Sequence, residues 1–306
     1  MIPFLIRRIL QLIPVLWGVG TLVFFFLFLV PGDPIDIMLG VSALPARKET
    51  LRAQLGLDQP LGTQYKKFWV GVLQGDLGES LLSKRPVAQL IRERLPATLE
   101  LAFLSVLIAL LIALPLGVAA AVRKGSLFDR FAIFFSLLGV SLPTFWLGPI
   151  LVLIFSIGLG LFPVSERTGW ESYVLPSFTL GLALSAILMR MTRASLLDVL
   201  GQDYVQTARA KGLSEFRVQW KHALRNALIP VITILSLQLG ALLSGTVITE
   251  TIFDWPGLGE LLYRAIQARD YPLVQGCVLV IACLYVLVNL AADFAYTLVN
   301  PQVRLE

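Results

Sequence analysis

The sequence predicts an all-α membrane protein with six transmembrane helices, and composition and patterning both point to it. Hydrophobic residues make up 57% of the 306 residues and charged residues 15%, with a mean hydropathy of +0.79. Ordinary soluble domains are about 45–50% apolar and about 25% charged. A membrane-spanning helix needs about 17–25 mainly apolar residues. Six uncharged runs meet or exceed that length: 9–30, 101–122, 131–165, 172–189, 226–249 and 271–292.

The first run resembles a signal peptide, because Arg7 and Arg8 precede it. Its 22 uncharged residues exceed the apolar core of a signal peptide, which is about 7–15 residues long, and no small-x-small cleavage site follows. The sequence Pro-Gly-Asp-Pro at 31–34 instead indicates an abrupt exit from the membrane. We therefore expect a retained first helix.

Residues 31–98 form the only long segment between two runs. Apolar residues with helical spacing predict two short helices in it, separated by a turn at 56–60: Leu51, Leu55, Phe68 and Val72. The sequence QGDLGESL that follows is typical of a loop. We expect residues 1–98 to form an N-terminal transmembrane helix with a helical extracytoplasmic loop, and residues 99–300 to form the main membrane domain.

The third run, 131–165, is too long for one straight crossing. Its prolines and glycines can end, kink or tilt a helix: Pro143, Gly148, Pro149, Gly158, Gly160 and Pro163. We place one span near 132–158. The alternative is a re-entrant pair of helices, which is less favoured because no polar turn interrupts the run.

Lysine and arginine counts predict the orientation, because short cytoplasmic segments carry the excess. With the N-terminus inside, the cytoplasmic segments hold thirteen: Arg7, Arg8, Arg123, Lys124, Arg130, Arg190, Arg193, Arg209, Lys211, Arg217, Lys221, Arg225 and Arg304. The short outer segments hold three: Arg167, Arg264 and Arg269. The long loop 31–98 is left out, because long loops cross with little regard to charge. Both termini are therefore expected in the cytoplasm.

Motifs of enzymes and of ATP binding are absent from the sequence. It contains no H-E-x-x-H, no G-x-S-x-G and no phosphate-binding G-x-x-x-x-G-K-[ST]. The single histidine, His222, stands among cationic residues that oppose metal binding. The net charge of +5 is explained by the cytoplasmic loops and requires no nucleic acid. We expect a chain that is not an enzyme and binds neither metal nor cofactor.

The six runs also lack ionisable residues, which ion-coupled carriers use inside the membrane. Asp293, near the inner end of the last run, is the exception, and a capping or ion-pairing role at the interface is favoured for it. An ion-coupled carrier is therefore a distant alternative. The energy source of a transport process is expected outside this chain.

A polar, strongly basic segment at 203–230, here called the coupling segment, separates the fourth and fifth runs. We expect Asp203 to cap a helix, with Gln206 completing a capping-box-like arrangement. The small residues Ala208 and Gly212 share a helical face with Val205, and Gly212 is expected to end that helix, before Ser214 caps the next. Such a face suits docking of a soluble partner. An amphipathic helix lying on anionic lipid explains the residues equally well.

Motifs along the whole chain resemble one family. TARAKG at 207–212 and HALRNALIP at 222–230 are similar to the cytoplasmic loop of ABC importer permeases, in particular the dipeptide/oligopeptide/nickel permease family. The further matching stretches are PGDP at 31–34, GLDQPL at 56–61, GDLGES at 75–80, LPATLELA at 95–102, GVSLPTFWLG at 139–148, LPSFTLG at 175–181, ETIFDWPGLGELL at 250–262, RDYP at 269–272 and NPQVR at 300–304.

The resemblance implies a type I importer transmembrane fold with one extra N-terminal helix, in which residues 99–300 are the permease domain. The family's Glu-Ala-Ala-x-x-x-Gly motif falls on Gln206, Thr207, Ala208 and Gly212, so its Glu and its first Ala are replaced. We expect this region to contact the ATPase. The candidate coupling residues are Gln206, Thr207, Ala208, Arg209, Ala210, Lys211, Gly212, Arg217, His222 and Arg225.

The resemblance also implies partners and a location. These are a second homologous permease, two ATPase subunits that bind ATP and Mg, an extracytoplasmic solute-binding protein and the bilayer of the bacterial inner membrane. The candidate outer contact or gate residues are Asp254, Trp255, Pro256, Gly257 and Gly259. A tight outer turn and a plain re-entry corner explain these glycines equally well. Peptides are the expected cargo, and nickel or a metal chelate is the alternative.

Overall fold

The computed structural model describes residues 2–29, 32–40, 43–165 and 167–299. The predicted positions of Pro31 and of the motif at 300–304, with Arg304, lie outside the described residues, as does the side chain of Asp293. Within the described ranges the chain is helical, apart from loops and an isolated antiparallel bridge between Glu79 and Pro86.

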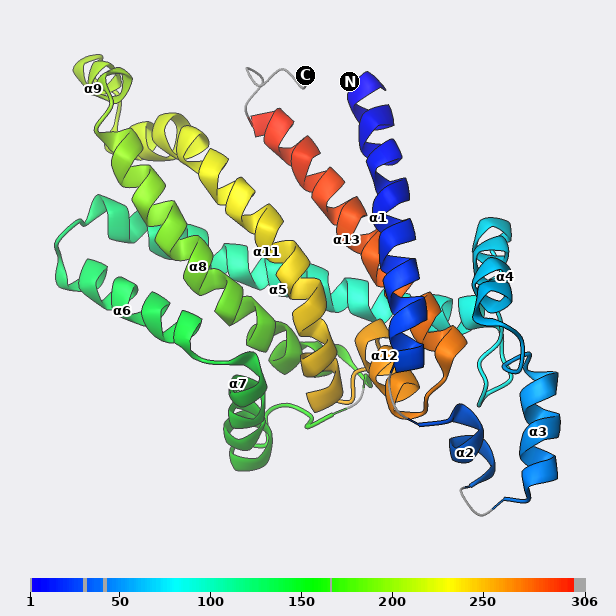
Figure 1. The fold of residues 1–306 in the computed structure, drawn as a ribbon. Coiled ribbons are helices and arrows are strands. Elements are labelled where there is room, and N and C mark those ends of the chain that lie inside the picture. Colours follow the sequence, from blue (N-terminus) through cyan, green and yellow to red (C-terminus); the bar gives the residue numbers. More distant parts are fainter. Residues whose placement is uncertain (1, 30–31, 41–42, 166, 300–306) are drawn as a thin grey trace. The chain divides into compact units, whose positions relative to one another are not determined.

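Figure 1 labels all of the α-helices except the short α10. Their bounds are α1 (Ile2–Leu29), α2 (Pro34–Leu39), α3 (Pro45–Gln54), α4 (Leu61–Gln74), α5 (Val87–Val122), α6 (Leu127–Ser141), α7 (Thr144–Leu151), α8 (Val174–Leu200), α9 (Asp203–Ala210), α10 (Glu215–Arg217), α11 (Leu224–Ile252), α12 (Leu258–Gln267) and α13 (Tyr271–Val299). Two π-helical stretches, Val152–Gly158 and Val218–Ala223, continue α7 and α10, and a 3₁₀ turn at Trp170–Tyr173 leads into α8.

Four described helices are long and apolar enough to cross a membrane. They correspond to Val87–Val122, Trp170–Leu200, Glu215–Gly240 and Tyr271–Ala291, and a bent pair of helices adds a fifth if it counts as one span. In α1 the described apolar part, Ile13–Leu29, is shorter. The structure thus gives four or five candidate spans where the sequence predicts six.

The predicted span near 132–158 is a broken helix rather than a straight one. Helix α6 ends at Ser141, and α7 with its π-helical continuation runs from Thr144 to Gly158 at an angle of 104° to it. The break has a local cause. Pro143 has no backbone N–H and disfavours helical backbone in the residue before it, and Leu142 is accordingly extended with ψ 116°. A bent single span and a re-entrant pair both fit this geometry.

The loop after the first helix is helical, as predicted. Helices α3 and α4 are separated at 55–60, where Gly56 has a positive φ of +68°, and α2 is an additional short helix. Asp33 caps α2 by accepting a hydrogen bond from the Ile35 N–H at 2.9 Å. An ion pair from Lys48 Nζ to Asp36 Oδ1, at 2.6 Å, joins α3 to α2.

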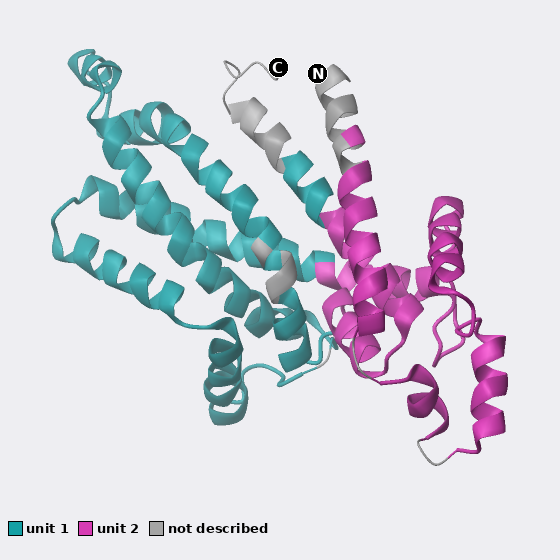
Figure 2. Cartoon of the chain, in the orientation of Figure 1, with its two compact units in different colours: residues 1–6, 99–255, 285–306 teal, residues 7–98, 256–284 magenta. Residues whose placement is uncertain are grey.

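The chain forms two compact units, shown in teal and magenta in Figure 2. Unit 1 contains residues 1–6, 99–255 and 285–306, and unit 2 contains residues 7–98 and 256–284. The predicted division at 98/99 is a division along the sequence, and it stays a prediction.

Unit 1 is built on small residues between long helices. Ala109, Ala113 and Ala120 of α5 are buried with Leu184 and Leu188 of α8 in one cluster. Close approach is also needed at Gly117, where an added Cβ would lie 2.9 Å from the Met189 carbonyl, and at Gly181, where it would lie 2.8 Å from the Ser105 carbonyl. Interfaces of small residues are typical of helices that pack within a membrane.

Unit 2 has an aromatic core and a buried carboxylate. Phe24 of α1 packs between Tyr65 and Phe68 of α4, with ring centroids 5.3 and 5.8 Å away. Asp270, which is 1% exposed, accepts hydrogen bonds from the Ser80 hydroxyl at 2.5 Å and the Leu81 N–H at 3.0 Å. These hydrogen bonds attach the loop at 75–86 to the short connection between α12 and α13.

Candidate functional site

Helix α9 of the coupling segment is anchored by two inward-facing residues. Val205 is fully buried and Ala208 is 8% exposed, in one cluster with the ends of three long helices. The partners in that cluster are Val118 and Ala121 of α5, Leu196 and Val199 of α8, Val218 and Ala223 of the π-helical stretch, and Leu224 and Ala227 of α11. Figure 1 shows α9 beyond the end of α8.

The helical face with Ala208 packs against this chain and is not open to a partner, which differs from the prediction. Ala208 packs inside the chain's own core, and Gly212 lies outside α9 rather than on its face, because the helix ends at Ala210. The surface that α9 offers to a partner is its opposite side. The predicted coupling residues exposed on α9 are Gln206, Thr207 and Ala210, and Lys211 and Gly212, which follow the helix, are exposed as well.

The predicted cap at Asp203 is wrong by one residue. Gln202 is the N-cap, with extended backbone, and no side chain caps the helix, so Gln206 completes no capping box. Asp203 is already helical, and its carbonyl accepts a hydrogen bond from the Thr207 hydroxyl at 3.0 Å. Its carboxylate still stands in the first turn, where negative charge is favourable.

Gly212 ends the helix as predicted. Its φ is +76°, a left-handed conformation that L-residues adopt at a cost, and its N–H bonds the Arg209 carbonyl at 2.9 Å. An added Cβ at Gly212 would meet nothing within 4 Å. The glycine is required by backbone geometry rather than by crowding. Ser214 then occupies the N-cap position of α10, without a side-chain capping bond.

Two contacts that sequence reasoning missed hold the turn together. Arg209 Nε donates to Glu215 Oε1 at 2.9 Å, joining α9 to α10. Asn226 Nδ2 donates to the Tyr204 hydroxyl at 2.7 Å, joining α11 to α9. Opposite charges six residues apart across a turn are the only sequence signal for the first pair, and the second has none.

The remaining predicted coupling residues lie on the basic stretch after the turn. Arg217 and Arg225 are exposed and His222 is half-buried. Beside them Phe216 and Trp220 form a tilted ring pair with centroids 6.0 Å apart, and they are 70% and 41% exposed. Large exposed aromatic residues next to arginines suit a protein interface or a lipid headgroup region.

The predicted outer residues span the point in the sequence where unit 1 gives way to unit 2, between Trp255 and Pro256. In unit 1, α11 ends at Ile252, and the turn is made by Asp254, which is exposed and has φ +46°. Trp255 is fully buried, and its N–H bonds the Glu250 carbonyl at 2.8 Å. In unit 2, Gly257 and Gly259 are buried at the start of α12, and neither has a positive φ. The left-handed backbone is therefore at Asp254, and the two glycines lead from it into α12.

Trp255 belongs to a polar and aromatic group in unit 1. Its ring lies edge-on to Tyr173, with centroids 4.7 Å apart. The Tyr173 hydroxyl donates to Glu100 Oε2 at 2.7 Å and accepts from Arg167 Nε at 2.7 Å, and Arg167 also bonds Glu100 at 2.5 Å. The hydrogen bond to Tyr173, aided by the Glu100 charge, raises the pKa of the Arg167 guanidinium above its ordinary value.

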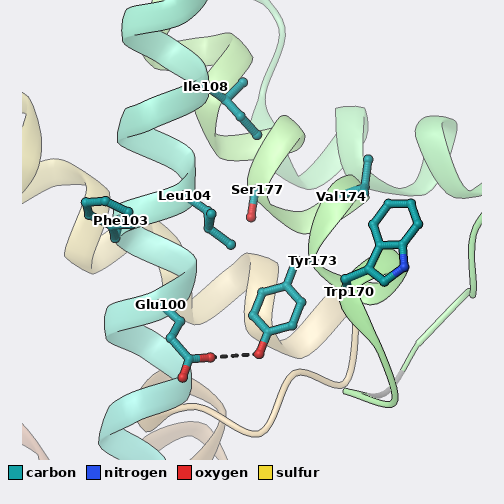
Figure 3. Close-up of a pocket in the computed structure, with 8 residues that line it drawn as sticks. All are labelled: Glu100, Phe103, Leu104, Ile108, Trp170, Tyr173, Val174 and Ser177. Atoms are coloured by element: carbon teal, nitrogen blue, oxygen red, sulfur yellow. Dashed lines mark hydrogen bonds between the residues drawn. The ribbon is translucent and has the colours of Figure 1, made fainter.

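A cavity of about 510 Å³ lies beside this group, between α5 and α8 (Figure 3). Its walls are mainly apolar and include Phe103, Leu104 and Ile108 of α5, with Trp170 on the other side. The Ser177 hydroxyl is buried there without a hydrogen-bond partner in the described part of the chain. The cavity therefore suits a mainly apolar group, and Glu100 and Tyr173 add a carboxylate and a hydroxyl to its lining.

The described residues include one buried ion pair near the predicted inner ends of the helices. Asp129 of α6 is 3% exposed and accepts hydrogen bonds from Nε and Nη2 of Arg193 in α8, with Nη2 2.8 Å from Oδ2. Asp129 also accepts from the Gly125 N–H at 2.9 Å. Among the described residues no group of three or more histidine, cysteine or acidic side chains is placed to hold a metal ion.

Comparison with known proteins gives the family. Residues 113–305 match the family described as the inner membrane component of binding-protein-dependent transport systems, and residues 1–102 match its N-terminal companion. The chain belongs to this family of transport permeases. The family expected from the motifs is thereby confirmed.

Individual relatives cover the permease from end to end. The glutathione transport system permease protein GsiC of Salmonella paratyphi A is 44% identical over 304 residues, with 99% of each chain covered. The dipeptide transport system permease protein DppB of Escherichia coli K12 is 43% identical, again with 99% of each chain covered. The MetNI methionine ABC transporter, in an inward-facing conformation, shares the fold, with a TM-score of 0.56 at 20% identity over 69% of this permease and 97% of that chain.

Proposed function

We propose that this permease forms half of the translocation path of an ATP-driven importer for di- or oligopeptides. The observation that carries the proposal is the full-length similarity, above 40%, to permeases named for a dipeptide and for glutathione, which is itself a tripeptide. A nickel or metal-chelate cargo within the same family is the alternative to which the sequence points. An ion-coupled carrier is now remote, because the family is binding-protein dependent.

We further propose six crossings with both termini in the cytoplasm. The thirteen basic residues of the short inner segments against three in the outer ones support this orientation. On this topology α1 crosses once, α6 with α7 makes one bent crossing, and α2–α4 lie outside the membrane. The coupling segment then faces the cytoplasm.

The coupling segment is proposed to receive force from an ATPase subunit. Its anchoring supports the proposal, because Val205 and Ala208 attach α9 to the ends of α5, α8 and α11 in one buried cluster. The opposite side of α9, with Gln206, Thr207 and Ala210, is exposed and available to a partner. A push on that side acts on several membrane helices together.

The complete importer is proposed to contain this chain, a similar second permease, two ATPase subunits and an extracytoplasmic solute-binding protein. ATP and Mg bind the ATPase subunits, and this chain binds no cofactor of its own. The exposed Asp254 and the buried Trp255, with Pro256, Gly257 and Gly259, are proposed as the outer contact or gate.

Reconstitution tests the proposed function. Vesicles containing the two permeases and the ATPases, with the binding protein added on the other side, are expected to accumulate labelled dipeptide only when ATP is supplied to the ATPase side. Accumulation of nickel chelate but not dipeptide would identify the alternative cargo. Concentrative dipeptide uptake by this permease without any ATPase would contradict the coupling proposal.

A further inference from the structure

Unit 2 contains a second cavity, of about 320 Å³, that the proposed function does not use. It is lined by α1, the turn between α3 and α4, α4 itself, the loop after α4 and the start of α13. Four aromatic rings form part of its wall: Phe24, Phe28, Phe68 and Tyr271. Its volume lies at the lower end of the range for small-ligand sites, which is about 300–1,000 Å³.

A mostly buried amide reaches this cavity without a partner. Gln275 of α13 lines the cavity and is 9% exposed, and its carboxamide makes no hydrogen bond within the described part of the chain. The oxygen and nitrogen of this carboxamide remain accessible from the cavity, so they are free to bond water or a ligand. A ligand with a hydrogen-bonding group would satisfy it.

Charges of both signs line the same cavity. Lys67 of α4 forms no ion pair with any described residue. Asp76, in the loop after α4, accepts one hydrogen bond, from the Gly78 N–H at 2.8 Å, and no described cation pairs with it. Both side chains are exposed and solvated, and at one cavity the ammonium of Lys67 and the carboxylate of Asp76 complement a zwitterion.

Glycines bring Asp76 to the cavity wall. An added Cβ on Gly71 of α4 would lie 2.8 Å from the Asp76 carbonyl oxygen, so the loop packs against the helix only because residue 71 has no side chain. Gly78 has φ +80°, which turns the loop back toward α13. The backbone conformation at these two glycines thus places Asp76 at the cavity.

We propose that this cavity is a binding site for a small zwitterion that carries an amide and an apolar side chain, the chemistry of a dipeptide. The ligand ammonium pairs with Asp76 and its carboxylate with Lys67. The amide bonds Gln275, and the side chain packs on the aromatic wall. The inference rests on the proposed function only in the choice of a dipeptide as probe.

Equilibrium binding of labelled Ala-Phe to the assembled complex in lipid nanodiscs tests the site, without ATP and without the solute-binding protein. Lys67→Gln, Asp76→Asn and Gln275→Leu are each expected to weaken binding, by about tenfold for the two charged partners. Lys66→Gln and Asp58→Asn are matched controls, because both residues are exposed and neither lines the cavity. The amount of labelled dipeptide bound in the translocation path should be the same in variants and controls.

Blocked peptides give a second readout, because blocking one end of the ligand should have the same effect as removing its partner residue. N-acetyl-Ala-Phe is expected to bind the wild type as weakly as free Ala-Phe binds Asp76→Asn, and that variant should weaken it no further. Ala-Phe amide should show the same relation to Lys67→Gln. If each blocked peptide matches its variant, Asp76 binds the ammonium end of the ligand and Lys67 binds the carboxylate end.

The proposal is overturned if the three variants bind Ala-Phe as the two controls do, or if blocking either end leaves wild-type binding unchanged. It is also overturned if no dipeptide binds the cavity and the same variants weaken binding of the solute-binding protein, since the cavity is then a docking surface. Uptake is measured in separate vesicles. Discrimination of blocked peptides without ATP-driven uptake supports this site and contradicts the proposed function.

Discussion

At the scale of single residues, Gly212 allows the backbone of the coupling segment to turn after α9. Its φ of +76° lies in the left-handed region, where a residue with a side chain costs about 1–2 kcal/mol, although a Cβ has open space around it. We expect Gly212→Val to redirect the chain between α9 and α10 and to uncouple ATP hydrolysis from uptake, with the permease still inserted. Hydrolysis and uptake are measured on the same vesicles.

Gly160→Val is the matched control for that variant. Gly160 also has a positive φ, +63°, with nothing within 4 Å of an added Cβ, and it lies far along the chain from the coupling segment. It carries the same backbone penalty. Unaltered coupling in Gly212→Val, or equal loss in both variants, would refute the role given to Gly212.

The Asp129–Arg193 pair predicts a large stability effect. Arg193→Ala leaves a carboxylate that is 3% exposed without its cation, and removing one partner of a buried pair costs about 3–5 kcal/mol. Thermal unfolding of the purified permease is expected at a clearly lower temperature. Arg190→Ala, an exposed neighbour on the same helix, should shift it little. Equal shifts in the two variants would show that the pair contributes nothing.

At the scale of elements, the anchoring of α9 is separable from its exposed surface. Val205 is fully buried, and replacing it with serine removes apolar contact and buries a hydroxyl. We expect Val205→Ser to loosen α9, so that protease cleavage in the coupling segment speeds up and transport falls. Val122→Ser, at a half-exposed position at the end of α5, should leave both unchanged. Equal protease resistance of Val205→Ser and wild type would contradict the anchoring.

At the bend between α6 and α7, a single bent crossing and a re-entrant pair can be distinguished by experiment. Cysteines at Lys124 and at Ser165, both exposed positions flanking the bent pair, should lie on opposite sides of the membrane if the pair is one crossing. We expect an impermeant thiol reagent added from outside to label Ser165→Cys and not Lys124→Cys. Labelling of both from one side would identify a re-entrant pair.

At the scale of the whole molecule, the orientation is testable in the same way. Ser83 in the loop after α4 and Ser214 in the coupling segment are both exposed. With Cys277 and Cys283 replaced, Ser83→Cys should react with the reagent from outside and Ser214→Cys only after the membrane is opened. The reverse pattern would invert the proposed topology.

Much of this fold was accessible from the sequence, because long uncharged runs and helix-breaking residues act locally. The separation of α3 from α4 and the end of α9 shortly before Gly212 follow from such signals. The inward burial of Ala208, the cap at Gln202 and the turn at Asp254 could not be predicted, because each depends on which surface packs against another helix. The sequence marks 203–230 as unusual, whereas only the structure separates its anchored side from its free one.

The burial of Val205 and Ala208 among the ends of α5, α8 and α11 has a mechanical consequence. These helices are stiff rods, and α8 with its 27 residues is about 40 Å long at about 1.5 Å per residue. A tilt of about 10° at the end beside α9 displaces the far end of such a rod by about 7 Å. If the coupling segment receives force as proposed, a small displacement beside α9 is enlarged at the far end of α8.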